Sequence, residues 1–375
     1  MPKTLRLTLP VMLHSDAEVP IFLAAKERLE ALGSQYGVPV SVGAFLPYMQ
    51  GHARKPANFI NQVRNQDKYR LPIWLAETGI DGTNSFVYTP GNAIYDANVP
   101  ADHERILEQV AKLRVLDPNP ISNLVVGPHI AAQFARSQDI KPGSVAVYTP
   151  EQFAEQRDAL YGMAKERFAK LSKSAGDLGL ILATEIAPLA TYEDHGFWEG
   201  SASDGERRRV TAMRYHAFND LTSLLDISEG RIVLDTTHLA GTLDAPNSFT
   251  RNREDTTNLF LTAGVSSWDE FRSKTKSFAD YLPHAHALHI SGAEGIGVRL
   301  NRETGAEKWG GAGMLPSLIT NRQYADLLHH AIAKDLPVAV EEDFITPEKP
   351  KERLDFIEAD EFLKPIFAQM QRMSS

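Results

Sequence analysis

The chain has 375 residues, 43% of them hydrophobic, and its 48 acidic and 39 basic side chains give a formal net charge of -9 at pH 7. This charge would repel a phosphate backbone, so nucleic acid is not an expected partner. The absence of cysteine excludes disulfides, thiolate nucleophiles and cysteine-held metals, so any metal must be bound by oxygen or imidazole. No stretch approaches the roughly 18 continuous apolar residues of a membrane span, and we expect a cytoplasmic protein without a membrane partner.

Short apolar runs rich in β-formers alternate with longer amphipathic stretches along the whole chain. This alternation is typical of repeated βα units around a parallel sheet. The first run is interrupted by Arg6, Thr8 and Pro10, and no convincing cleavage site follows it, so we interpret it as a strand instead of a signal peptide. Eight strands are predicted: Leu5–Leu13, Val38–Phe45, Leu71–Ala76, Ser122–Gly127, Leu178–Ile186, Arg231–Asp235, Ala285–Ile290 and Leu336–Glu341.

One helical pattern follows each predicted strand. Eight such units predict a (β/α)8 TIM barrel, formed as a single domain over residues 1–375 with enlarged loops. The run 143–148 is an extra extended piece, and 239–266 is interpreted as an extended loop, either at the active-site mouth or as a solvated insertion. The helices are predicted near residues 20–33, 55–66, 101–115, 151–177, 204–227, 267–281, 321–334 and 358–372.

Four polar residues end four consecutive predicted strands that are otherwise apolar: Glu185, Asp235, His289 and Glu341. A single charged residue after a strand is ordinarily the chain reaching solvent, but four in succession are not explained in this way. Their spacings of 50, 54 and 52 residues place each one in its own βα unit. All four can therefore face one axis at the C-terminal end of the barrel, where barrel enzymes carry out catalysis.

Three carboxylates gathered this closely would raise one another's pKa unless a cation lay between them. Two glutamates, one aspartate and one histidine form a set of mainly oxygen ligands with one nitrogen. Such a set suits one divalent metal ion, with Mn²⁺ preferred and Mg²⁺, Co²⁺ or Zn²⁺ also compatible.

The segments around these residues resemble the xylose-isomerase-like TIM-barrel superfamily, which contains sugar isomerases, ketose 3-epimerases, inosose dehydratases and apurinic endonucleases. The segment Ile232-Val-Leu-Asp235-Thr-Thr-His238-Leu is similar to that family's strand-six motif. Leu288-His289-Ile-Ser-Gly, Val338-Ala-Val-Glu341 and Glu185 before Ile-Ala-Pro-Leu are similar to the ligands of strands seven, eight and five. The resemblance covers about residues 178–345.

The resemblance implies a metal held by Glu185, Asp235, His289 and Glu341 that binds two adjacent oxygens of a sugar or polyol substrate. Glu185 and Glu341 would then be the catalytic pair, one removing a carbon-bound proton and the other returning it through a metal-stabilised enediolate. This chemistry is that of an isomerase or epimerase, and expulsion of a β-hydroxyl would make it a dehydratase or lyase.

Four further residues are candidates for substrate binding. The family motif makes His238 a substrate-orienting group, although it could also cap the turn that follows. His129 follows the fourth strand and either meets substrate or is a loop histidine, and His195 with Trp198 could form an aromatic and polar wall for a sugar or pack within their own loop. The glycine-rich run 308–314 is interpreted as a plain turn or a lid.

Two other functions remain as alternatives. An apurinic endonuclease would need extra histidines after the third and seventh strands, where this chain has Glu77-Thr-Gly and Ile-Ser-Gly-Ala-Glu294. A non-catalytic barrel is not favoured, because both proton-transfer groups and the ligand set are present. The substrate, the oligomeric state and the role of residues 239–284 stay open, and a homo-oligomer is compatible with the sequence.

Overall fold

A computed structural model gives the fold of the chain. It describes residues 3–46, 56–77, 85–88, 108, 111–117, 124–127, 129–135, 150–187, 190–193, 212–216, 218, 220–252, 256–290, 293–300, 307–312, 318–340 and 356–374.

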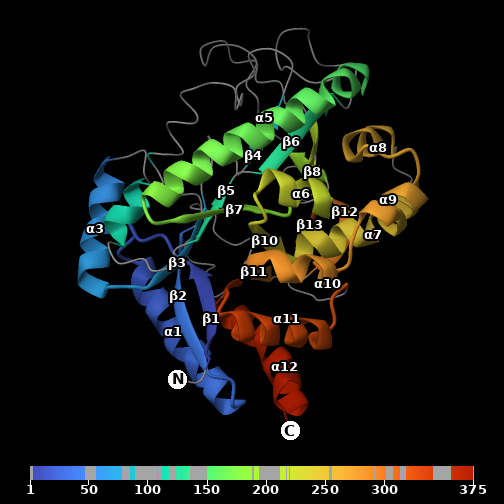
Figure 1. Cartoon of the computed structure of the whole chain (residues 1–375). Helices are drawn as coiled ribbons and strands as arrows, with labels where there is room; N and C mark the ends of the chain where they lie inside the picture. The colour runs from blue at the N-terminus through green and yellow to red at the C-terminus, as the bar shows by residue number, and fades with distance from the viewer. Residues whose placement is uncertain are drawn as a thin grey trace.

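Eight parallel strands form a closed barrel, in the order β1-β14-β11-β10-β7-β5-β3-β2 (Figure 1). The first and last barrel strands, β1 and β14, pair directly, which closes the ring. Each of the eight predicted strands overlaps one of these strands, so the predicted barrel is confirmed. The barrel strands are β1 (Leu5–Pro10), β2 (Val40–Leu46), β3 (Ile73–Glu77), β5 (Leu124–Gly127), β7 (Ile181–Glu185), β10 (Ile232–Asp235), β11 (Ala285–Ile290) and β14 (Pro337–Val340).

Helices surround the barrel, and the C-terminal helix α12 packs on both α11 and α1 near the two chain ends (Figure 1). The predictions near 20–33, 55–66, 151–177, 321–334 and 358–372 are confirmed within a few residues at each end. The described helices are α1 (Glu18–Gln35), α3 (Pro56–Tyr69), α5 (Pro150–Asp177), α6 (Leu221–Ile227), α7 (Thr236–Asn252), α8 (Thr257–Ala263), α9 (Trp268–Lys274), α10 (Phe278–Tyr281), the short η1 (Leu282–His284), α11 (Asn321–Lys334) and α12 (Phe356–Ser374).

The loop predicted over 239–266 was wrong, because α7 and α8 occupy most of it. Asn, Asp and Thr lower helix propensity only slightly, and α7 is initiated from outside this range by Asp235, whose carboxylate accepts a hydrogen bond from the His238 backbone. The helix predicted over 267–281 is divided in two by Thr275, whose backbone is extended.

Two other predictions were also wrong in part. Among the described residues of the helix predicted over 204–227, those of α6 are helical, and residues 212–216 form strand β9 (Ala212–His216). The glycine-rich run predicted as a turn or lid lies largely within strand β13 (Glu307–Ala312). Near 101–115, residues 111–116 are helical. The extended piece predicted at 143–148 lies outside the described residues.

One layer of buried side chains fills the barrel and consists mostly of small residues. Because side chains alternate along a strand, residues two positions away from this layer lie on the same inner face. The layer is formed by Phe45, Leu75, Ala183, Val233, Ala287 and Ala339. It separates the N-terminal end of the barrel from the end that carries the polar residues.

Arg6 and Trp74 contact each other at the N-terminal end of the barrel. The guanidinium of Arg6 lies 4.7 Å from the Trp74 ring centroid, and its Nη1 is 3.6 Å from Asp335 Oδ2. Burial lowers the pKa of Arg6, which nonetheless stays far above neutrality, and Asp335 opposes this shift. The Arg6 guanidinium, stacked on Trp74, therefore lies at the end of the barrel opposite the candidate site.

A second sheet of six strands was not predicted, and it is built from excursions that follow barrel strands β3, β5, β7 and β11. We call it the rim sheet. Its order is β12-β13-β8-β9-β6-β4. Besides β9 and β13 it contains β4 (Ser85–Tyr88), β6 (His129–Ala135), β8 (Ala190–Glu193) and β12 (Ala293–Leu300).

No helix within the described residues is long and apolar enough to cross a membrane.

The fold predicts the effect of two glycine substitutions. A Cβ on Gly43 would lie 2.7 Å from Trp74 Cε3 and 2.9 Å from the Pro72 carbonyl oxygen, and that backbone atom cannot yield easily. We expect Gly43→Ala to lower the free energy of unfolding by about 1–3 kcal/mol in urea titrations. Gly162→Ala in α5 is the control, because its Cβ meets nothing within 4 Å and should stabilise the protein by up to ~1 kcal/mol. Equal stability of the two variants would contradict the packing at Gly43.

Candidate functional site

Three of the four predicted ligands lie at the C-terminal ends of neighbouring barrel strands. Glu185 ends β7, Asp235 ends β10, and His289 is the penultimate residue of β11. Asp235 and His289 are direct partners in the pairing of β10 with β11. Each stands two positions after a member of the inner layer, respectively Ala183, Val233 and Ala287. The alternation of the strands therefore turns all three toward the barrel axis.

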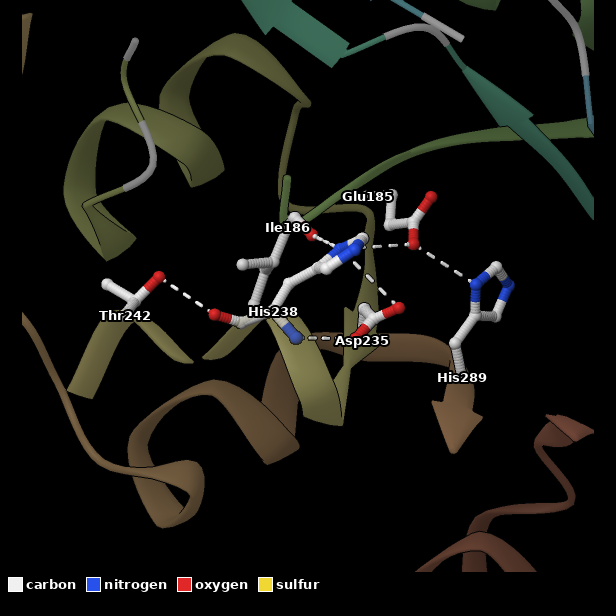
Figure 2. Close-up of polar contacts among 6 residues, drawn as sticks. All are labelled: Glu185, Ile186, Asp235, His238, Thr242 and His289. Atoms are coloured by element: carbon white, nitrogen blue, oxygen red, sulfur yellow. Dashed lines mark hydrogen bonds and ion pairs between the residues drawn. The ribbon is translucent and has the colours of Figure 1, made fainter. Parts of the chain in front are cut away.

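The three side chains are almost completely buried and lie close together (Figure 2). Nδ1 of His289 is 3.1 Å from Oε1 of Glu185. The His289 ring also packs on Phe45 of the inner layer, with the ring centroids 5.7 Å apart. His289 is thus held between a carboxylate and an aromatic ring.

His238 joins this cluster from the first turn of α7. Its Nδ1 lies 2.8 Å from the carbonyl oxygen of Ile186, 3.4 Å from Oδ2 of Asp235 and 3.6 Å from Oε1 of Glu185 (Figure 2). A carbonyl oxygen can only accept a hydrogen bond, so Nδ1 of His238 carries the proton. The His238 side chain is 21% exposed.

Asp235 also starts α7. Its Oδ1 accepts a hydrogen bond from the backbone N–H of His238, at 2.7 Å, which is the geometry of a helix N-cap. The same carboxylate therefore faces the site with one oxygen and holds the first turn of the helix with the other. Thr242 strengthens this turn by donating its hydroxyl to the His238 carbonyl oxygen at 2.8 Å.

Glu185, Asp235 and His238 each offer a ligand atom within 4.8 Å of the other two, which is close enough to hold one metal ion. The protonated Nδ1 of His238 cannot be such a ligand, however. Two atoms bound to one small divalent ion at right angles lie about 3 Å apart. His289 is not one of these three residues, but its Nδ1 lies 3.1 Å from Oε1 of Glu185, and its assignment as the nitrogen ligand stays a prediction.

Tyr324 of α11 is a neighbour of the site that the sequence did not indicate. It is fully buried, packs edge-on against Phe362 at 5.2 Å, and reaches Thr236, the residue after Asp235. Burial raises the pKa of its hydroxyl well above the ordinary range, while the contact with Thr236 lowers it in part. The helical spacing of α11 marks Tyr324 as a core position but does not reveal this contact.

The other predicted site residues cannot be placed in the same way. Glu341, His195 and Trp198 lie outside the described residues. His129 is the first residue of β6, so its backbone lies at the end of that strand where the chain arrives from barrel strand β5. The assignment of these four residues to the site stays a prediction.

Several solved structures are similar to the chain, whereas no model of a known protein family and no curated protein sequence matches it. A proposed sugar phosphate isomerase/epimerase from Anabaena variabilis shares 13% identity, with 99% of each chain covered and a TM-score of 0.48. A D-tagatose 3-epimerase-like protein shares 12% identity, with 98% of this chain and 99% of that chain covered and a TM-score of 0.48. A xylose isomerase-like TIM-barrel protein from Mycobacterium smegmatis, in complex with magnesium, shares 14% identity over 97% of each chain, with a TM-score of 0.41.

The barrel itself is established by its strand pairing. Fold and site together define the chain as a (β/α)8 barrel with an acidic and histidine cluster at the C-terminal ends of its strands.

The N-cap role of Asp235 can be separated from its place in the cluster. Asp235→Asn and Asp235→Ala remove the same charge, but only asparagine keeps an oxygen that can accept from the helix. In metal-free buffer we expect the Asn variant to be about 1 kcal/mol more stable than the Ala variant in urea titrations. Equal stability of the two would show that the hydrogen bond to His238 does not stabilise α7.

Proposed function

We propose that the chain is a divalent-metal-dependent isomerase or epimerase of a sugar or polyol. The observation that carries the proposal is the meeting of two buried carboxylates, Glu185 and Asp235, with two imidazoles at the C-terminal end of the barrel. The substrate would be a small molecule, and the proposal involves neither nucleic acid nor a membrane.

The donor set fits a metal ion. Burying two carboxylates within 4.8 Å of each other is costly unless a cation or a proton compensates their charge. The imidazole of His289 lies beside Glu185, where a neutral ring nitrogen can serve as a further ligand. Two oxygen donors and one nitrogen suit Mn²⁺, which we prefer, and also Mg²⁺, Co²⁺ or Zn²⁺.

The fourth ligand in this proposal is Glu341. Ala339 belongs to the inner layer, and Val340 is the last residue of β14. The alternation that turns Glu185, Asp235 and His289 inward predicts the same face for the residue two positions after Ala339, namely Glu341. Its neighbour Glu342 is predicted to face the opposite way.

Each of these residues would have a separate role in the reaction. A bound ion would polarise the substrate carbonyl and make the neighbouring C–H more acidic. Glu185 removes the proton from that carbon or returns it, and Glu341 does the converse from the other face, which inverts a stereocentre or moves the carbonyl. His238, whose Nδ1 is held by the Ile186 carbonyl oxygen, would orient the substrate.

The proposal is tested by metal analysis combined with proton exchange. We expect about one divalent ion per chain, with Mn²⁺ restoring activity after chelation, and ion-dependent loss of a carbon-bound proton from a ketose, aldose or inosose in D2O, followed by NMR. Glu185→Gln should lower the exchange rate by at least ~100-fold, because it removes a proton-transfer group. No ion after reconstitution would overturn the proposal, and ion binding with elimination of water would turn it toward a dehydratase or lyase.

The assignment of Glu341 is tested against its neighbour. We expect Glu341→Gln to lose both metal affinity and exchange, whereas Glu342→Gln, with the same change of charge, should keep both within about twofold. Elemental analysis after dialysis gives the first quantity and NMR gives the second. Loss at Glu342 with retention at Glu341 would mean that the inner face at the end of β14 is shifted by one residue.

A further inference from the structure

Thr8 is a polar residue of barrel strand β1 whose side chain is completely buried. Its register partner on β14 is Ala339, a member of the inner layer, and paired residues of neighbouring parallel strands lie on the same face. Its register partner on β2 is Gly43, which has no side chain. The Thr8 hydroxyl therefore lies inside the barrel, between two positions that contribute at most a methyl group.

The Thr8 hydroxyl has no hydrogen-bond partner among the described residues. Two positions before Thr8 on the same face is Arg6, which is directed toward the Asp335 carbonyl oxygen, 3.3 Å from its Nη1. Two positions after Thr8 is Pro10, whose side chain has neither a donor nor an acceptor. Burying a hydroxyl in this way costs free energy, because its hydrogen bonds to water are lost. Its two neighbours on β1 leave the hydroxyl to a partner across the barrel.

One register row joins Thr8 to two residues of the candidate site. Ala339 pairs with Thr8 on one side and with His289 on the other. His289 in turn pairs with Asp235. Neighbouring strands lie about 4.8 Å apart, so the backbones of Thr8 and His289 are separated by roughly 10 Å across the small side chain of Ala339. A hydroxyl and an imidazole that both extend inward can span this gap, directly or with one water between them.

The contact between Phe45 and His289 shows that side chains reach this far across the barrel. Phe45 lies on β2, whereas Thr8 lies on β1, one strand closer to the strand of His289. The ring centroids of Phe45 and His289 are nevertheless 5.7 Å apart. Both rings are buried, so a hydrogen bond formed beside them would be shielded from water and strengthened by the low dielectric.

We propose that the Thr8 hydroxyl is a positioning group for His289. Its oxygen accepts a hydrogen bond from the Nε2–H of His289, directly or through one ordered water, which leaves Nδ1 unprotonated toward Glu185 and the metal ion. The inference rests on the proposed function, in which His289 is the nitrogen ligand. A histidine that binds a metal through one ring nitrogen is ordinarily oriented by a hydrogen bond at the other, which fixes its tautomer. Because His289 is completely buried, bulk water cannot supply this bond, and Thr8 is an acceptor in the same register row.

The test varies the hydroxyl and measures three quantities: calorimetric titration of the chelated protein with Mn²⁺ alone, proton exchange in D2O, and urea unfolding in metal-free buffer. Thr8→Val removes the hydroxyl with little change of shape, and it should lower the Mn²⁺ affinity and the exchange rate by at least ~10-fold, as expected when a group that orients a metal ligand is lost. Without metal the same variant should unfold at the same or a higher urea concentration, because a buried hydroxyl without a partner is removed. Thr8→Ser keeps the hydroxyl and should retain the Mn²⁺ affinity within about threefold.

The control is Thr262→Val on α8, which makes the same change at a buried threonine outside the cluster and should leave the Mn²⁺ affinity unchanged. Weaker binding in Thr8→Val with recovery in Thr8→Ser supports the inference even where no sugar exchanges a proton. Unchanged affinity in Thr8→Val, or an equal loss in Thr8→Ser or in Thr262→Val, overturns the inference and leaves the proposed function standing.

Two further outcomes are also decisive. If Thr8→Val does not fold, Thr8→Ala takes its place, and equal Mn²⁺ affinity of the Ala and Ser variants overturns the role of the hydroxyl. If the wild-type chain binds no divalent ion, the proposed function fails first and the inference fails with it.

Discussion

The candidate site depends on the alternation of side chains along the strands of a closed parallel barrel. In such a barrel the face that contacts the helices and the face that contacts the axis are fixed residue by residue. The inner layer contains Ala183, Val233 and Ala287, so the polar residues two positions later are brought to the axis by geometry alone. A shift of one residue in any of these strands would turn its functional group into the helical layer. The small residues of the layer and the buried Phe45 therefore fill the barrel on the N-terminal side of the site.

Asp235 links this geometry to the first helix beyond it. One oxygen of its carboxylate caps α7 and the other faces Nδ1 of His238, so the start of the helix and the arrangement of the cluster are set by one side chain. The next residue, Thr236, is buried and contacts Tyr324 of α11. A carboxylate fixed in this way cannot rotate freely to avoid Glu185. The fold thus maintains a close pair of carboxyl groups, whose charge a divalent cation or a proton would compensate.

The barrel and the position of the cluster could be predicted from the sequence because both depend on local patterns. Apolar runs of four to seven residues ending in Glu185, Asp235 or His289 are visible without knowledge of any distant contact. Helix α7 was missed because residues 239–266 are rich in polar residues and include Pro246, whereas the cap that starts the helix lies upstream of them. The rim sheet was missed because its strands contain four to eight residues each and become sheet only through partners far away in the chain.

The two sheets suggest how reaction type and substrate choice can be divided within one chain. The cluster lies on barrel strands, whose inner faces are constrained on every side and tolerate little change. The rim sheet is built from excursions after those strands, so its residues can differ without disturbing the inner layer. Proton transfer next to a carbonyl needs the same few groups whatever the rest of the substrate is. Changes in the rim sheet could therefore alter the substrate of the proposed reaction while the barrel strands keep Glu185, Asp235 and His289 in place.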